Sequence, residues 1–234
     1  MNARVAALYR YPVKSMGGAG LSRAHVGPGG IPGDRGWALR ERAAGRAASA
    51  KRFAPLMLCK ARFVDEPAAG KAPPPAEVEL PDGTRARTDD PRSNALLSRL
   101  LGAEVAFARE DDGAGHFDSK PLHFLTTATL AFMRAETGLD FDARRFRPNV
   151  LIEFDAPGRP EDEWPGKTLL VGGIPVRMLK PVKRCVMTTL PQPPLAAEKG
   201  VLAAVLARGG ALGVYGEALA AGAWSAGDSL EFGN

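Results

Sequence analysis

The stretch Lys183-Arg184-Cys185-Val186-Met187-Thr188-Thr189 places a thiol directly after two basic side chains and before two hydroxyls. The thiolate is the reactive form of cysteine, and adjacent positive charge lowers the pKa of a thiol. Prolines at positions 191, 193 and 194 follow and predict a turn. These surroundings favour a thiolate at the wall of a pocket. The alternative is a half-buried structural cysteine, because free cysteine is among the most buried residue types and a single cysteine is weak support for a site.

Composition around this stretch is that of a globular protein. The chain has 234 residues, of which 45% are hydrophobic and 24% charged, and it is long enough to bury a core. Its 27 glycines and 20 prolines favour many short elements joined by turns. The net charge of +5 favours an anionic ligand. No run of Lys and Arg is interleaved with aromatic residues, so we expect no nucleic-acid partner.

The ends of the chain and its cysteines bear on the compartment. Residues 1–4 lead into a strand-like segment without a signal peptide, and no apolar stretch reaches about 18 residues. We therefore expect a cytoplasmic protein with no membrane partner. Cys59 and Cys185 leave a disulfide open, although nothing indicates an oxidising compartment. Cys59 lies in a predicted apolar strand and is interpreted as structural.

Short apolar runs separated by turn residues predict a mostly β chain with a few helices (α+β) and a barrel-like core. The polar segment 110–115 predicts a boundary between two domains, residues 1–110 and 111–234. Residues 161–164 are predicted as an acidic loop. Helices are predicted over residues 90–101, from residues 126–127 to 137, and over 196–207. Strands are predicted over residues 5–10, 21–26, 37–40, 56–64, 77–80, 84–87, 104–109, 150–154, 169–171, 174–180, 214–219 and 229–232.

Two glycine-containing segments imitate nucleotide loops, and both fail. Pro32 stands where the third glycine of a dinucleotide loop should be, and Glu161 stands where the first glycine of a P-loop ending at Thr168 should be. A better anion site is the start of the second predicted helix. There Thr126 and Thr127 are good N-cap residues, and a helix N-terminus offers free N–H groups.

Five segments, taken in order, carry a family likeness. They are Tyr11-Pro12-Val13-Lys14-Ser15, Gly33-Asp34-Arg35-Gly36-Trp37, Pro121-Leu122-His123-Phe124-Leu125-Thr126-Thr127, Arg145-Phe146-Arg147-Pro148-Asn149 and the Cys185 stretch. With them the chain resembles the MOSC superfamily (molybdenum cofactor sulfurase C-terminal domain) together with the β-barrel domain that precedes it in many members. Within that superfamily it is similar to the group of the mitochondrial amidoxime-reducing component and its bacterial relatives. The ending, from residues 213–215 to 227–228, also resembles the family.

The resemblance implies a MOSC-type β-barrel in residues 111–234 and an associated N-terminal β-rich barrel domain in residues 1–110. It implies a molybdenum cofactor (Mo-pyranopterin) with Cys185 as catalytic residue and metal ligand, and a soft thiolate is a reasonable donor for such a metal. The pattern of the residues supports an anionic group in one respect, because basic side chains repeatedly stand beside turns. The cofactor-binding residues that the resemblance implies are Lys14, Ser15, Arg35, Thr126, Thr127, Arg147, Asn149 and Arg184.

Three further residues have two interpretations. For Arg40 and Arg145, a solvated surface charge is as good an interpretation as a ligand role. His123 is interpreted as a core or supporting residue rather than a metal ligand. The family often has Asp-Pro after its cysteine loop, whereas this chain has Leu190-Pro191-Gln192, so the resemblance leaves the choice of substrate open.

The activity that the resemblance implies is reduction of small N-hydroxylated compounds. Electrons would come from an external protein of the ferredoxin, flavodoxin or cytochrome type, since two cysteines cannot supply the four thiolates of an iron–sulfur cluster. An alternative is a sulfur-carrier or cofactor-handling protein with a persulfide on Cys185. A third interpretation is a barrel module that binds a partner and has lost the cofactor; the retained Lys14, Arg35 and Cys185 argue against it.

Overall fold

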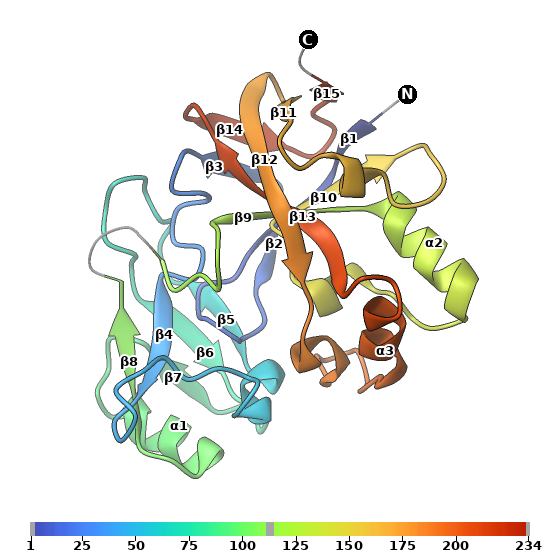
Figure 1. Cartoon of the computed structure of the whole chain (residues 1–234). Helices are drawn as coiled ribbons and strands as arrows, with labels where there is room; N and C mark the ends of the chain where they lie inside the picture. Colours follow the sequence, from blue (N-terminus) through green and yellow to red (C-terminus); the bar gives the residue numbers. More distant parts are fainter. Residues whose placement is uncertain (1–2, 111–114, 233–234) are drawn as a thin grey trace.

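The computed structural model describes residues 3–110 and 115–232 (Figure 1). Its largest element is an eight-stranded sheet in the order β15-β11-β12-β13-β9-β10-β1-β2, in which β9 and β10 run parallel and the other neighbours antiparallel. The mostly β class predicted from the sequence is confirmed. The strands are β1 Ala3–Arg10, β2 Ala19–Leu21, β9 Leu122–Thr126, β10 Val150–Phe154, β11 Thr168–Val171, β12 Ile174–Lys183, β13 Ala211–Ala218 and β15 Leu230–Phe232.

This sheet curls so that β1, the first strand of the chain, meets the turn that leads into β15, the last. The backbone N–H of Val5 in β1 donates to the carbonyl of Asp228 at 2.8 Å, and Gly227 N donates back to Val5 O at 2.8 Å. Large side chains fill the space inside the curl, among them the fully buried Phe124 and Trp224, whose rings meet edge to face at 5.9 Å between centroids. The result is a partly closed barrel around one apolar core.

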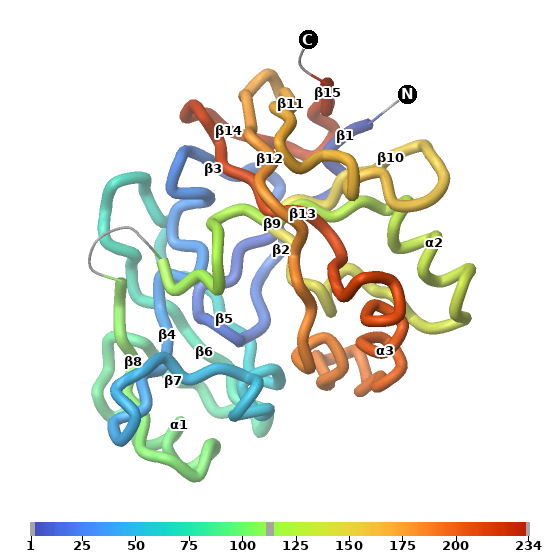
Figure 2. Tube along the Cα trace, viewed as in Figure 1, coloured from blue at the N-terminus to red at the C-terminus, as the bar shows by residue number. Residues whose placement is uncertain are grey.

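A second β-rich unit lies beside the barrel, at the lower left of Figures 1 and 2. It has its own apolar core, which includes Val13, Leu56, Val78 and Leu97. Its strands form a two-stranded pair, β4 with β8, and a three-stranded sheet, β5-β6-β7. The bounds are β4 Trp37–Glu41, η1 Ala54–Leu58, β5 Lys60–Phe63, β6 Ala76–Glu79, β7 Arg85–Arg87, α1 Ser93–Leu101 and β8 Val105–Arg109.

The chain crosses between the two units near its start. Val5 and Leu8 of β1 belong to the barrel core, whereas Val13 belongs to the second core. A further strand, β3 (Arg23–Val26), returns to the barrel side and pairs with β14 (Gly222–Ser225). In space, therefore, the first strands of the chain belong with the last ones. The domain division at residue 110 stays a prediction, and part of the segment on which it falls lies outside the described residues.

Helices cover one end of the barrel, around a third apolar cluster that contains Leu130, Phe146 and Val205. No helix of the described residues is long and apolar enough to cross a membrane. The helices of this half are α2 Thr127–Thr137, η2 Ala143–Phe146, η3 Pro160–Glu163, η4 Val186–Thr189 and α3 Gly200–Leu206, where η denotes a 3-10 helix.

Several predicted boundaries are wrong for local reasons. The strand predicted over residues 56–64 begins only at Lys60, because Ala54–Leu58 form the 3-10 helix η1, with Pro55 in its first turn and Cys59 as its C-cap. The helix predicted from residue 90 begins at Ser93, after a turn in which Asp90 Oδ1 accepts from Arg92 N at 3.0 Å. The segment 21–26 divides between β2 and β3, β14 was not predicted, and α3 is shorter than residues 196–207.

The predicted acidic loop at residues 161–164 is instead η3, with a buried carboxylate. Glu161 Oε2 accepts hydrogen bonds from the hydroxyls of Thr126 and Thr129, both at 2.6 Å. Thr126 caps α2 as predicted, since its Oγ accepts from Thr129 N at 3.1 Å. The N-terminus of α2 thus faces a carboxylate of the protein itself, which suits the helix dipole. Burial raises the pKa of Glu161, against the effect of the two hydroxyls.

Glu161 gives a stability prediction. A raised pKa means that the folded protein favours the protonated acid, so the Glu161 contribution to the free energy of unfolding should fall as pH rises above about 4.3. Glu161→Gln removes this dependence. In urea unfolding between pH 4 and 8, the difference between wild type and E161Q should therefore shift steadily against the wild type as pH rises.

The control is Glu163→Gln, which changes an exposed carboxylate of the same 3-10 helix. Its difference from wild type should stay flat over this range. Parallel pH profiles for wild type and E161Q would show that Glu161 has no raised pKa.

Candidate functional site

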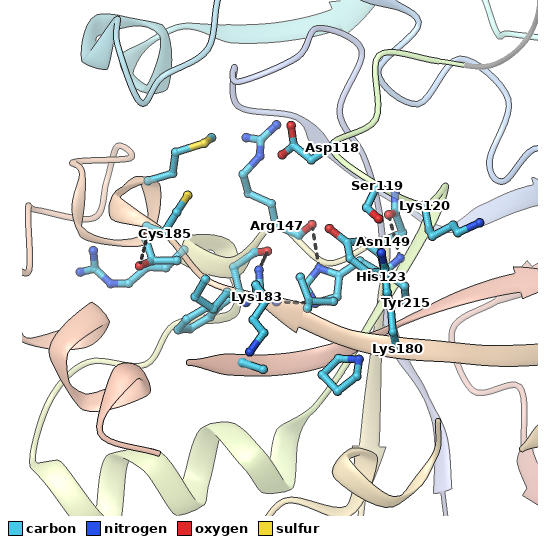
Figure 3. Close-up of a pocket in the computed structure, with 18 of the residues that line it drawn as sticks. Asp118, Ser119, Lys120, His123, Arg147, Asn149, Lys180, Lys183, Cys185 and Tyr215 are labelled. Carbon is cyan, nitrogen blue, oxygen red and sulfur yellow. Dashed lines mark hydrogen bonds between the residues drawn. The ribbon is translucent and has the colours of Figure 1, made fainter. Parts of the chain in front are cut away.

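A cavity of about 910 Å³ opens between the barrel, the second unit and the Cys185 loop (Figure 3). Among the described residues that line it, Asp118 carries the one carboxylate. A cleft lined by one sign of charge attracts ligands of the opposite sign. The cavity therefore suits an anion. Its basic lining residues are Lys14, Arg35, Lys51, Lys120, Arg145, Arg147, Lys180, Lys183 and Arg184.

Three lining residues have left-handed backbones. The φ angles are 67° at Ser15, 53° at Arg35 and 55° at Arg147, and no other non-glycine residue of the described chain has positive φ. Such a conformation costs on the order of 1–3 kcal/mol for a side chain other than glycine, and it clusters at functional sites. All three residues were predicted as cofactor-binding, and the fold brings them to one cavity.

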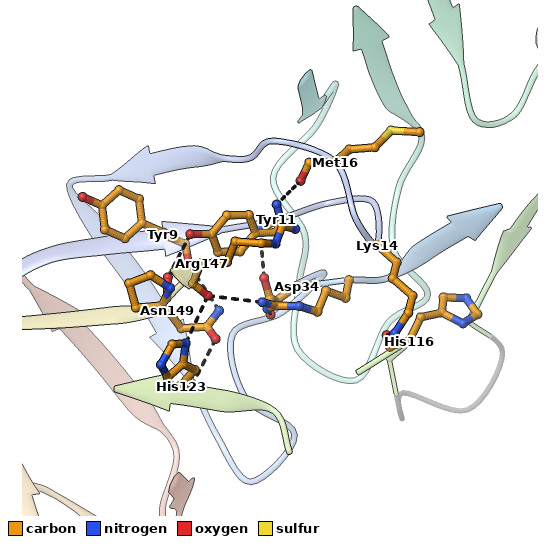
Figure 4. Close-up of polar contacts among 11 residues, drawn as sticks. Tyr9, Tyr11, Lys14, Met16, Asp34, His116, His123, Arg147 and Asn149 are labelled. Atoms are coloured by element: carbon orange, nitrogen blue, oxygen red, sulfur yellow. Dashed lines mark hydrogen bonds and ion pairs between the residues drawn. The ribbon is translucent and has the colours of Figure 1, made fainter. Parts of the chain in front are cut away.

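Tyr11 holds two of these arginines together (Figure 4). The guanidinium carbon of Arg147 lies 4.2 Å from the centroid of the Tyr11 ring, and that of Arg35 lies 4.9 Å from it. Buried Asp34 pairs with Arg35 and accepts from Tyr11 N at 2.8 Å. Burial opposes the charge of Arg35, but Asp34 and Tyr11 outweigh it and raise its pKa. Cation–π contact and one carboxylate thus hold two like charges at the wall.

Arg147 is the more buried of the pair. Its Nη1 donates to Met16 O at 2.6 Å, while its Nη2 is buried and has no hydrogen-bond partner among the described residues. Burial, followed by the charge of Arg35, lowers the pKa of Arg147 to about 10, so the group is still protonated at neutral pH. A buried donor without an acceptor costs about 1–3 kcal/mol. An anion in the cavity would satisfy it.

Lys14 and Ser15 are partly engaged with the protein. Lys14 Nζ donates to His116 O at 2.8 Å and forms an ion pair with Asp118. Burial would raise the pKa of Asp118, but Lys14 outweighs it and lowers that pKa. The Ser15 oxygen accepts from Ala50 N at 3.1 Å, which leaves its hydroxyl proton to donate.

Arg184 anchors the loop that carries Cys185. Its side chain donates to the carbonyls of Phe146, at 3.0 Å, and Leu212, at 2.8 Å, and its Nη2 lies 2.6 Å from Nε2 of His123. Burial, before any other cause, lowers the pKa of Arg184 to about 10. Arg184 was predicted to bind the cofactor. The structure gives its guanidinium three protein partners, so its first role is to hold the loop.

His123 has one tautomer in this arrangement. Because a guanidinium only donates, Nε2 accepts from Arg184, and the ring proton lies on Nδ1, 3.3 Å from Arg147 O. Burial, followed by the charge of Arg184, lowers the pKa of His123 well below its ordinary value, which keeps the ring neutral. The supporting role predicted for His123 matches these contacts. A continuous chain of contacts joins the cysteine loop to the backbone of the strained Arg147.

Asn149 holds β9, the strand that contains His123, in place. Its Oδ1 accepts from His123 N at 3.2 Å, and its Nδ2 donates to Tyr9 O at 3.3 Å. Asn149 lines the cavity, as predicted, but its amide is used by the backbone of the barrel. It positions β9 against β1 and β10.

Cys185 is half-buried and lines the cavity. Its carbonyl accepts from the Thr188 hydroxyl at 3.0 Å, which closes the turn into η4. Cys59 is buried, and both thiols are free, so the disulfide that the sequence left open does not form. Gln192 is buried and ties the loop to η2, since its Nε2 donates to Arg145 O at 3.4 Å.

The expectation that Thr126 and Thr127 line this cavity is wrong. Thr126 is fully buried against Glu161, and the Thr127 hydroxyl accepts from Phe154 N at 3.3 Å. Neither lies among the residues that line the cavity. The helix signal was read correctly, but the anion at that helix is Glu161.

Arg40 and Arg145, which had two interpretations each, differ in exposure and in their position relative to the cavity. Arg40 is exposed and donates to Gly45 O at 2.9 Å away from the cavity, so it is a surface charge. Arg145 lines the cavity but is buried, and its Nη1 donates to Ala196 O at 3.0 Å.

Sequence reasoning missed Tyr11, Asp118, Tyr215 and every lysine of the cavity except Lys14 as functional candidates. Tyr11 stands directly before the predicted lysine and serine segment, but its role depends on two arginines far along the chain. Lys183 stands in the cysteine stretch and was considered only for its effect on the thiol. Besides Lys14, the lining lysines outside that stretch are Lys51, Lys120 and Lys180.

Comparison with known families and structures agrees with this architecture. The model of the MOSC N-terminal beta barrel domain matches residues 2–103, and that of the MOSC domain matches residues 110–231. The crystal structure of the YUAD protein from Bacillus subtilis aligns over 99% of this chain and 96% of its own, with a TM-score of 0.52 and 16% identity. At that identity the likeness shows the fold. YiiM from Geobacillus stearothermophilus aligns over 49% of this chain and 55% of its own, with 19% identity and a TM-score of 0.37. A comparison with curated proteins found no match.

Arg184 gives a prediction for the loop anchor. Arg184→Lys keeps the charge but loses the planar fork, which leaves carbonyls and His123 Nε2 without donors, so the free energy of unfolding should fall by about 2–4 kcal/mol. Urea unfolding measures this.

The matched control is Arg177→Lys in β12, the strand that ends just before Arg184; its side chain is exposed and pairs with Glu217. It should change the free energy of unfolding by less than about 0.5 kcal/mol. Equal effects of the two substitutions would show that the contacts of Arg184 do not hold the loop.

Proposed function

Because the chain belongs to the MOSC domain family, we propose that it binds a pyranopterin molybdenum cofactor in this cavity and reduces small N-hydroxylated compounds. MOSC domains are associated with molybdenum-cofactor binding. One observation carries the proposal: the half-buried Cys185 thiol lines the same strongly basic cavity as buried Arg147, whose Nη2 has no hydrogen-bond partner among the described residues.

The residues fit such a group. A pyranopterin carries a phosphate, and an arginine with a free buried donor is suited to receive one. Arg35 and Lys14 line the same cavity, and backbone strain at Ser15, Arg35 and Arg147 marks it as preorganised. A single thiol offers the soft donor that a molybdenum centre would accept.

Each side chain has a distinct task in this proposal. Cys185 would bind the metal, and Arg147, Arg35 and Lys14 would hold the anionic part of the cofactor. When bound, the cofactor would supply two-electron oxygen-atom transfer. Arg184 and His123 fix where the thiol lies, because they tie its loop to Leu212 and to the backbone of Arg147.

Electrons would come from an external protein of the ferredoxin, flavodoxin or cytochrome type. The chain has two cysteines, one of them buried, and an iron–sulfur cluster of the ferredoxin type needs four. The segment Leu190-Pro191-Gln192 stands where the family often has Asp-Pro. Here Gln192 is buried and bonded to the loop, so no carboxylate at this point would meet the substrate.

A second candidate rests on the accessibility of Cys185. A half-buried thiol at the wall of a basic cavity could also carry a persulfide, as a sulfur-carrier or cofactor-handling protein would need. The two functions differ in metal content, since a carrier would not retain stoichiometric molybdenum.

The first test is elemental analysis of molybdenum in protein from a cofactor-producing host. Wild type should contain close to one equivalent, and Cys185→Ala should lose the metal or change its absorption spectrum. Cys59→Ala is the control, because it removes the other thiol, which lies outside the cavity, and it should keep its metal. No molybdenum in wild type, with a persulfide on Cys185 by mass spectrometry, would favour the second candidate.

The second test addresses the buried arginine. Arg147→Met keeps much of the length of the side chain but removes its donors, so the cofactor-free protein should bind pyrophosphate about tenfold or more weakly by calorimetry. Arg144→Met is the control, since Arg144 is nearby in sequence but pairs with Asp142 and lies outside the cavity. Equal affinities in R147M and wild type would exclude Arg147 as the anion anchor.

A further inference from the structure

The cavity holds more positive charge than the arginine cluster over Tyr11 (Arg35 and Arg147) accounts for. Lys120, Lys180 and Lys183 line it and are exposed, and their ammonium groups form no hydrogen bond or ion pair with any described residue. By contrast, Arg184, Arg145 and Lys14 each have protein partners, and Arg147 and Arg35 lie over Tyr11. Lys51 also lines the cavity, but its charge acts on Asp118, whose pKa it helps to lower. Three lysines therefore remain with charges that nothing in the described protein neutralises.

Two of these lysines reach the cavity because of an irregular strand. Four consecutive residues, 180–183, line the cavity, although successive side chains of a regular strand point to opposite faces. The pairing of β12 with β13 shifts register between Met178 and Pro181 and again between Pro181 and Lys183. Bulges redirect side chains and are frequent beside active sites. The irregularity thus brings both Lys180 and Lys183 to one cavity.

The lysines lie apart from the thiol. In Figure 3, Cys185 is on one side of the view and Lys120, Lys180 and Tyr215 are on the other, with Lys183 between. Pro181, Val182 and Ala211 also line the cavity and provide apolar surface. A small molecule with one reactive end near Cys185 could therefore place an anionic end among the lysines.

We propose that Lys120, Lys180 and Lys183 form a second anion subsite, which binds a carboxylate or phosphate group of the substrate. This inference rests on the proposed function and narrows its substrate class to N-hydroxylated compounds with an anionic group. The arginine cluster serves the phosphate of the cofactor, and the lysines serve the substrate. Flexible, hydrated ammonium groups suit a ligand that must leave after each turnover, whereas the buried arginines suit one that stays.

The first arm of the test needs no cofactor. The cofactor-free protein is reductively methylated with ¹³C, which keeps the charge of each lysine, and Lys180 and Lys183 resonances are assigned with Lys180→Ala and Lys183→Ala. Phenylphosphonate should shift both resonances with saturation, whereas neutral phenol should not. Lys71 is the internal control, since it is exposed and outside the cavity. Uniform, unsaturated shifts at all lysines would overturn the subsite.

The second arm uses the cofactor-loaded enzyme and two substrates, benzhydroxamic acid and 4-carboxybenzhydroxamic acid. The double variant Lys180→Ala/Lys183→Ala should raise KM for the carboxylated substrate about tenfold, with little change for the neutral one. Lys71→Ala should change neither. The preference for the carboxylated substrate should also weaken at high salt, because exposed charges are screened.

The two arms separate the possible failures. If the wild type holds no molybdenum, the proposed function fails, and the first arm still decides whether the lysines bind an anion. If the first arm succeeds but the double variant changes KM equally for both substrates, the substrate assignment is overturned, and the lysines instead bind a phosphate of the cofactor.

Discussion

The contact of two guanidinium groups with one phenol ring is the constraint on which the cavity depends. Arg35 and Arg147 carry like charges, and burial disfavours both, yet Arg147 remains protonated at neutral pH with a pKa of about 10. Buried Asp34 and the Tyr11 ring make this tolerable, because one supplies a counter-charge and the other a quadrupole. The remaining Nη2 of Arg147 has no partner in the described chain. The fold thus holds both charges but leaves one hydrogen-bond donor of Arg147 unused. A preorganised anion site requires such a donor, held in place before the anion binds.

The topology explains how such a cluster can form. Tyr11 follows directly after β1, which lies inside the barrel sheet between β10 and β2, and the chain then enters the second unit. Arg147 precedes β10, the neighbour of β1 in the same sheet. Arg35 precedes β4 of the second unit. The cavity is therefore made where the chain passes from one unit to the other, and neither unit alone has the full set of residues.

Sequence reasoning located residues that line one cavity where a short segment carries the family likeness, and it failed where a residue acts through a distant one. Lys14, Ser15, Arg35 and Arg147 were predicted because short segments around them carry the family likeness, and the fold brings them to one cavity. Thr126 was predicted correctly as a helix cap. The helix start was also predicted to bind an anion, which is wrong because the Glu161 side chain, 35 residues later, occupies that N-terminus. Residues 161–164 were predicted as an acidic loop, whereas Glu161 lies in a 3-10 helix with its carboxylate buried between two hydroxyls. Likewise, the contact of Arg184 with His123 joins residues 61 positions apart, and no local pattern indicates it.

The same reasoning applies to the lysines, where the local pattern was misleading for a physical reason. Alternation along a strand places Lys180 and Lys183 on opposite faces, and a proline between them predicts the end of the strand. The strand instead continues to Lys183, because the pairing with β13 absorbs the proline at a pair of register shifts. An irregular strand costs ladder hydrogen bonds, so its presence beside a cavity needs a compensating role. Bringing two lysines without a side-chain partner among the described residues to the wall of that cavity is such a role. It gives the cavity two kinds of cation: buried arginines fixed by aromatic and backbone contacts, and exposed lysines.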